Sequence, residues 1–325
     1  MNSSFQSAVA HLPSHTDQSA GTAEDKRLPA VTWWSRLELP TWGLIAMIYS
    51  GWLACVLHWQ ALGSWLGTPL LIVLTAWYMS LQHELIHGHP SANARFNALL
   101  GQLPLAVWYP YAVYRDSHLG HHHNETLTLP GVDPETYYVS QTTQTAQAGG
   151  NQRSLQLRRF RNTSAGRLLI GPALAWSQTI RAAWLARDRK TVITWGGHGL
   201  LLAGLLVLLQ RAGISPLYYV LAIAYPALSL TMVRSLFEHR AVDAEHARSV
   251  INEAAWPWRI LFLNLNYHLV HHLHPGLPWF HLRLAYLAKR ETYLEQSEGF
   301  VEHGYLPLLW RYRSTPVIAD VHPFA

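Results

Sequence analysis

The chain carries His83-Glu84-Leu85-Ile86-His87, then His118-Leu119-Gly120-His121-His122, and finally His268-Leu269-Val270-His271-His272. In a helix, residues three or four apart lie on the same face, so each stretch can direct its imidazoles toward one point. Histidine makes up 20 of the 325 residues, so one HxxxH pattern and two HxxHH patterns are rarely expected together by chance. The three stretches therefore predict a metal site whose ligands are imidazole nitrogens.

The composition is that of a membrane protein. Half of the residues are hydrophobic, 13% are charged, and there are 15 Trp and 15 Tyr, residues enriched where membrane helices meet water. Four apolar segments have about the length that crosses a ~30 Å hydrocarbon layer, and each pair is separated by only a few residues. We therefore predict an all-α integral membrane protein with four transmembrane helices in two hairpins. The four segments are Trp42–Trp59, Leu62–Gln82, Val192–Gln210 and Leu217–Leu236.

Basic residues orient these hairpins. Three Lys or Arg precede the first segment, none lies in the first hairpin loop, eleven lie between the second and third segments, one lies in the second hairpin loop, and nine follow from Arg234 onward. The positive-inside rule then puts both termini and the long middle segment in the cytoplasm. All three histidine stretches fall on that side, where we expect a histidine-rich helical cap. Since the basic residues follow the cytoplasmic loops, the net charge of +5 calls for no nucleic-acid partner.

Two further apolar stretches lie in the middle segment, at residues 96–114 and 168–185. Proline or glycine interrupts each of them and arginines flank them. This pattern favours helices in the membrane interface over full spans.

The order and spacing of the three histidine stretches resemble the histidine boxes of the membrane fatty acid desaturase superfamily, which also includes alkane hydroxylases and carotenoid ketolases and hydroxylases. The resemblance covers about Leu81 to Phe280. It implies two non-haem irons on a cytosolic cap, which use dioxygen as co-substrate to remove hydrogen from an unactivated C–H bond. It also implies a ninth ligand, His239, from Glu238-His239-Arg240. The implied metal ligands are His83, His87, His118, His121, His122, His239, His268, His271 and His272.

Within the superfamily, the layout is most similar to acyl desaturases of bacterial type. The expected activity is therefore an oxygen-dependent introduction of a double bond into an acyl chain, at a bacterial inner membrane. A hydroxylase, a ketolase or an oxidative decarboxylase acting on a lipid or hydrocarbon remains open. The single Cys55 excludes an iron–sulfur cluster held by this chain alone. Electrons are thus expected from a ferredoxin or a cytochrome b5-like carrier with its reductase.

Two other classes of function compete with this interpretation. The first stretch also spells HExxH, in which two histidines bind zinc and the glutamate, here Glu84, acts as general base of a metalloprotease. A histidine-rich metal carrier without catalysis is the other class. Both leave two rigidly spaced HxxHH stretches on the same side of the membrane unexplained.

The remaining expectations concern domains and neighbouring residues. We expect a polar cytoplasmic segment over residues 1–40, a membrane domain with the di-iron site over 41–290 and a cytoplasmic tail over 291–325. Asn264 is a candidate holder of a metal-bound water. His11, His15, His303 and His322 are expected to be exposed to solvent. Six acids near the boxes are candidates to orient imidazoles through their second ring nitrogen, namely Asp116, Glu125, Asp133, Glu135, Glu238 and Glu253.

Overall fold

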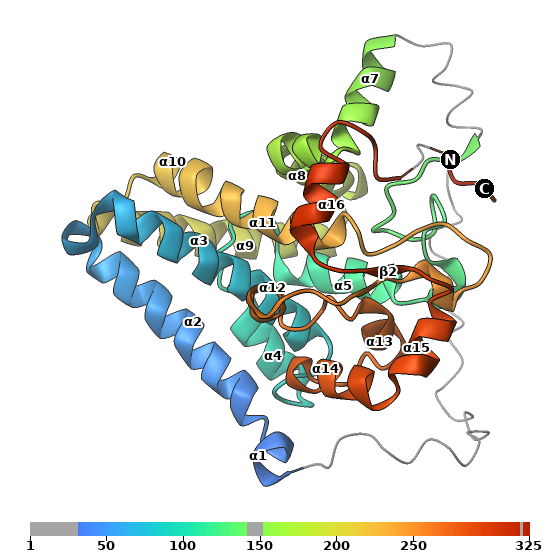
Figure 1. Ribbon diagram of the computed structural model, residues 1–325. Coiled ribbons are helices and arrows are strands. Elements are labelled where there is room, and N and C mark those ends of the chain that lie inside the picture. Colours follow the sequence, from blue (N-terminus) through green and yellow to red (C-terminus); the bar gives the residue numbers. More distant parts are fainter. Residues whose placement is uncertain (1–31, 142–151, 319–320) are drawn as a thin grey trace.

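The computed structural model describes residues 32–141, 152–318 and 321–325 (Figure 1). Most of the predicted N-terminal segment, with His11 and His15, lies outside the described residues. The described residues are mostly helical, as predicted, and the division of the chain into three segments stays a prediction. The first half contains α1 (Trp33–Arg36), α2 (Leu39–Leu57), α3 (Trp59–Ile86), α4 (Ala94–Gly101), α5 (Tyr111–His121), η1 (Asn124–Thr126), α7 (Gln152–Arg161) and α8 (Ser164–Ala186).

The second half begins with the last two long apolar helices and ends in a group of short elements. They are α9 (Arg189–Arg211), α10 (Pro216–Tyr218), η2 (Tyr219–Ala224), α11 (Tyr225–Ser235), η3 (His246–Arg248), β1 (Ile251–Asn252), α12 (Trp256–Leu261), α13 (His268–Leu273), α14 (Trp279–Ala288), α15 (Arg290–Gln296), β2 (Val301–Glu302) and α16 (Tyr305–Arg311).

Among the described residues, four helices are long and apolar enough to cross a membrane, which confirms the four predicted segments. The fourth is a continuous helix made of α10, η2 and α11, and η2 within it is a π-helical stretch. Pro226 follows directly in α11, where it lacks the N–H that a regular helix would donate to Ala222. The four helices are Leu39–Leu57, Trp59–Ile86, Arg189–Arg211 and Pro216–Ser235.

The short loops of the two pairs of apolar helices meet at one end of the bundle. Gly63 breaks α3 with φ of 66°, a backbone conformation that glycine adopts without strain. Across the two loops, Gln60 Nε2 donates to the carbonyl oxygen of Ala212 at 3.4 Å. Nearby, the hydroxyls of Thr68 and Tyr218 hydrogen-bond at 2.7 Å. This geometry fits two hairpins with both loops on one side, although their placement in a membrane stays a prediction.

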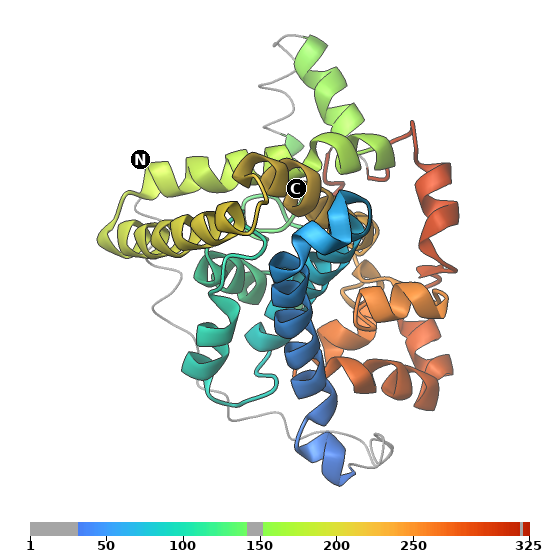
Figure 2. The same cartoon turned by 90° about the vertical axis from the view of Figure 1, so that its left-hand side faces the viewer.

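The opposite end of α3 enters a cap formed by the C-terminal elements, drawn in orange and red in Figure 1. Strands β1 and β2 pair in parallel there, with Ile251 opposite Val301. Ile251 of β1 belongs to one buried apolar cluster together with Leu269 and Tyr286. In the turned view, the cap lies on the side away from the loop that joins α8 to α9 (Figure 2).

The two stretches predicted to lie in the interface form different structures. Residues 96–114 divide into α4 and α5, with a non-helical segment between them. Residues 168–185 lie in the single 23-residue helix α8, which continues through Pro172. Its side chains Trp176, Ile180 and Trp184 are exposed. An exposed aromatic and aliphatic face suits a helix that lies against lipid.

The predicted orientation can be tested with single cysteines in a Cys55→Ser background. We expect that a thiol reagent that cannot cross the membrane labels Ser64→Cys in intact cells. It should label Ser314→Cys only after the membrane is opened, because the positive-inside rule places the C-terminal part in the cytoplasm. Both positions are exposed in the structure. Labelling of position 314 from outside would contradict the predicted topology.

Candidate metal centre

The structure brings all nine predicted histidines together in two adjacent groups. Within each group, one nitrogen from every ring lies within 4.8 Å of the others, which is close enough for a shared metal ion. The first group draws on all three boxes and has five members, and the second has four. The groups are His83, His87, His118, His122 and His271, and then His121, His239, His268 and His272.

Four different parts of the chain supply these rings. The first box occupies the last turn of α3, and its second histidine, His87, is the C-cap. The second box ends α5, and the third forms the first turns of α13. His239 lies after α11, where its backbone bridges to Ser249 in antiparallel fashion. His118 in α5 and the C-cap His122 are four residues apart and belong to the first group, while His121 belongs to the second.

The ring nitrogens face one another at about 3 Å. Nε2 of His118 lies 3.1 Å from Nε2 of His87 and 3.0 Å from Nε2 of His122. In the second group, Nε2 of His239 lies 3.0 Å from Nε2 of both His121 and His268. Two nitrogens bound at about 2.1 Å to one metal, and about 90° apart, would be roughly 3.0 Å apart. The spacing is therefore that of ligands around an ion.

In two of the rings, a contact at Nδ1 determines which of the two ring nitrogens has a free lone pair. Nδ1 of His121 lies 2.9 Å from Asp133 Oδ1, and Nδ1 of His118 lies 3.3 Å from Glu135 Oε1. Because a carboxylate only accepts hydrogen bonds, each Nδ1 donates, and Nε2 is left as an acceptor or metal ligand.

In the third box, the Nδ1 atoms of two rings lie near a side-chain oxygen. Nδ1 of His268 lies 3.2 Å from Glu238 Oε1, and Nδ1 of His272 lies 3.1 Å from Asn124 Oδ1. In the ninth ligand candidate, Nδ1 of His239 lies 3.4 Å from Ser249 Oγ. These contacts orient the rings with their Nε2 atoms toward the group interior.

Burial and charge set the protonation of these groups. Burial, reinforced by the charge on His118, lowers the pKa of His87 to about 3. Burial also lowers the pKa of His118, although Glu135 acts against it. Burial lowers the pKa of His121 as well, but the Glu135 and Asp133 carboxylates outweigh it and raise that pKa to about 9. Burial opposes ionisation of Glu135, yet His121 and His118 bring its pKa down to about 2. Glu135 is thus ionised beside the two rings that lower its pKa.

Not every predicted partner lies at the centre. Asp133, Glu135 and Glu238 do, whereas Asp116 pairs with Arg115 and Lys190, and Glu253 pairs with Arg290. Glu125 contributes its backbone oxygen, which accepts from Arg248. Asn124 was not predicted, because an asparagine two residues after His122 has no distinctive spacing.

Two other expectations are wrong or unsupported. His303 is exposed as expected, but His322 is buried, because its Nε2 hydrogen-bonds Thr128 Oγ1 at 3.0 Å. Asn264, a candidate water holder, donates instead to the carbonyl oxygen of Trp279 at 3.1 Å.

Glu84 holds two parts of the protein together. It is buried, and its Oε2 accepts the backbone N–H of Trp279 at 3.0 Å, at the start of α14. Its Oε1 lies 3.6 Å from Nδ1 of His83. One carboxylate oxygen of Glu84 thus has a structural partner in the backbone of Trp279, a role that differs from that of a zinc-peptidase general base.

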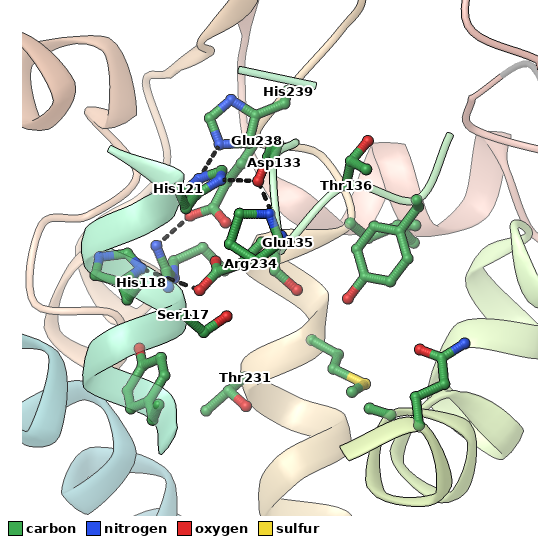
Figure 3. Close-up of a pocket in the computed structure, with 18 of the residues that line it drawn as sticks. Ser117, His118, His121, Asp133, Glu135, Thr136, Thr231, Arg234, Glu238 and His239 are labelled. Atoms are coloured by element: carbon green, nitrogen blue, oxygen red, sulfur yellow. Dashed lines mark hydrogen bonds and ion pairs between the residues drawn. The ribbon is translucent and has the colours of Figure 1, made fainter. Parts of the chain in front are cut away.

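A cavity of about 580 Å³ opens beside the second group. Its walls come from α5, α8, α11 and the segment 128–138, and His118, His121, His239 and His268 form part of its lining. Figure 3 shows His118 and His121 at one wall, with Asp133 and Glu135 next to them. Apolar residues such as Met79, Leu228 and Met232 line the cavity as well. The cavity thus joins a polar, histidine-lined end to apolar walls.

Comparison with known proteins agrees with this geometry. A family model described as fatty acid desaturase matches residues 59–303, which include all nine histidines. A comparison with curated proteins found no match to the chain. The matched region covers well over half of the sequence, so the chain belongs to the fatty acid desaturase family.

Proposed function

We propose that this protein is an acyl-chain desaturase that binds two iron ions through its nine clustered histidines. Membership of the family supports an oxidoreductase that acts on a lipid at a membrane. The observation that carries the more specific proposal is the division of nine rings into two adjacent groups beside one cavity. Two irons bound there would supply the activation of dioxygen needed to remove hydrogen from an alkyl chain.

The donor set fits iron. Neutral imidazole is a suitable ligand for iron, and five and four rings leave room for further ligands in each group. Both ring nitrogens of His83 are buried without a hydrogen-bond partner among the described residues. Buried polar atoms are normally satisfied, so this ring lacks a partner that a metal would provide.

The chain's own residues have separate tasks in this proposal. Asp133, Glu135 and Glu238 hold the rings in the orientation and tautomer that a metal requires. The cavity walls hold the acyl chain and exclude water from it. Since Cys55 is a lone buried thiol, electrons are expected from a separate carrier, either a ferredoxin or a cytochrome b5-like protein with its reductase.

The ligand assignment is tested by replacing single histidines. We expect His271→Ala to lower the iron content of the purified protein, from about two ions per chain, and to abolish activity. His303→Ala should change neither quantity, because that side chain is exposed and lies beside Glu253. Iron is measured by elemental analysis, with folding checked by circular dichroism. A His271→Ala protein with full iron and full activity would refute the assignment.

The orienting role of the acids predicts a graded effect. Asp133→Asn keeps the size of the side chain but removes the charge beside His121, and we expect metal affinity or activity to fall roughly 10- to 100-fold. Asp116→Asn is the matched control, because Asp116 pairs with Arg115 and Lys190 on the surface. Equal effects of the two substitutions would contradict a specific role for Asp133.

The reaction itself is identified by product analysis under labelled dioxygen. Desaturation should give a product two mass units lighter than the substrate, without label. Retained label would indicate a hydroxylase or ketolase instead, and loss of carbon dioxide would indicate a decarboxylase. Turnover in the absence of oxygen would reject the proposed function, and the His271→Ala protein serves as the inactive control.

A further inference from the structure

Arg167 lies in the first turn of α8 and lines the cavity. The residue is 1% exposed, and none of its three guanidinium nitrogens has a hydrogen-bond partner among the described residues. Its guanidinium stacks on the ring of Tyr137, whose centroid lies 3.5 Å from Arg167 Cζ. A buried guanidinium carries a full charge and five N–H donors, and an uncompensated charge of this kind is costly. The arrangement therefore lacks an anion.

The acids in the cavity wall cannot serve as that anion. Asp133 and Glu135 are directed at His121 and His118. Glu238 pairs with Arg234 and also lies 3.2 Å from Nδ1 of His268. Among the lining residues that the structure describes, Arg167 is thus the cation without a carboxylate.

The cavity extends along the same face of α8. Arg167, Ala175, Thr179 and Ala182 recur at helical spacing and line it, and from Arg167 to Ala182 the helix rises about 22 Å. Gly171 makes room for the arginine stem, because a Cβ at that position would lie 3.0 Å from both Arg167 Cδ and Met232 Sδ. The result is an elongated space with a buried cation in its wall.

We propose that Arg167 binds the carboxylate of an unesterified fatty acid, so that the substrate enters as the free acid. This inference rests on the proposed function, which supplies the reaction that takes place after the fatty acid has bound. A planar guanidinium matches a carboxylate through two parallel N–H···O bonds. Because Arg167 is enclosed, only a head group small enough to enter the cavity reaches it. The head group of an acyl thioester or a phospholipid is too bulky to enter.

A purely structural role for Arg167 predicts a different outcome. If its stacking on Tyr137 mainly stabilised the fold, Arg167→Met would lower the melting temperature. If Arg167 is a ligand-binding residue, the same substitution removes an unpaired buried charge. The melting temperature of the ligand-free protein should then stay the same or rise.

The test measures binding without turnover, using purified full-length protein in detergent and no electron donor. Isothermal titration calorimetry compares dodecanoate with methyl dodecanoate, so that partition of the chain cancels in the ratio. We expect Arg167→Met to weaken dodecanoate binding about 10- to 100-fold, the range for hydrogen bonds to a charged group. The ester should bind equally to both proteins, and Arg167→Lys should retain part of the preference for the acid. Arg181→Met, an exposed arginine on the same helix, is the control and should match the parent.

Dodecyl phosphate and dodecanoyl-CoA complete the experiment. Tighter binding of either one than of dodecanoate, with the same dependence on Arg167, would overturn the assignment to a carboxylate. An unchanged ratio of acid to ester in Arg167→Met would overturn the role of Arg167. Acid-selective binding without any desaturated product would reject only the proposed function. Desaturation of acyl chains without acid-selective binding would reject only the inference about Arg167.

Discussion

The facing Nε2 atoms of the histidine groups are the constraint on which the structure depends. Pairs such as His118 with His122, and His239 with His268, bring two ring nitrogens to about 3.0 Å from each other. Where a carboxylate holds the Nδ1 proton, as Glu135 does for His118, the Nε2 atom of a neutral ring has no proton to donate, and an ion between the facing nitrogens would make the arrangement favourable. The protein must therefore fix the rings from outside, through their Nδ1 atoms and their backbones.

The elements that carry the rings differ in how they are held. The first box is part of the 28-residue helix α3 and is fixed by the packing of the bundle. The third box lies in α13, which has only six residues and would not be stable alone. The cap compensates, because Leu269 is buried in its apolar cluster and the backbone N–H of Leu269 donates to Val250. The short strands and helices of the cap thus hold in place the short helix that carries the third box.

Much of this centre follows from the sequence, and the rest depends on loop geometry. Helical spacing identified the box histidines, and hydropathy identified the four apolar helices. The spacing could not separate Asp133 from Asp116, because the difference lies in how the segment after α5 turns back over His121. His322 was expected to be exposed because it is near the end of the chain. It is buried because Val321 pairs with Val139, which carries it to Thr128.

The three acids near the histidine groups do not form ion pairs with Arg167, and the charges around the cavity explain why. The nine imidazoles bring no negative charge, so Asp133, Glu135 and Glu238 are the acids that would offset bound cations, acting through the rings beside them. Glu238 also pairs with Arg234, so part of its negative charge is already balanced. If Glu135 turned to Arg167, His118 would lose its acceptor and its tautomer would no longer be fixed. An anion that arrives with the substrate would satisfy Arg167 without taking a carboxylate from the metal ligands.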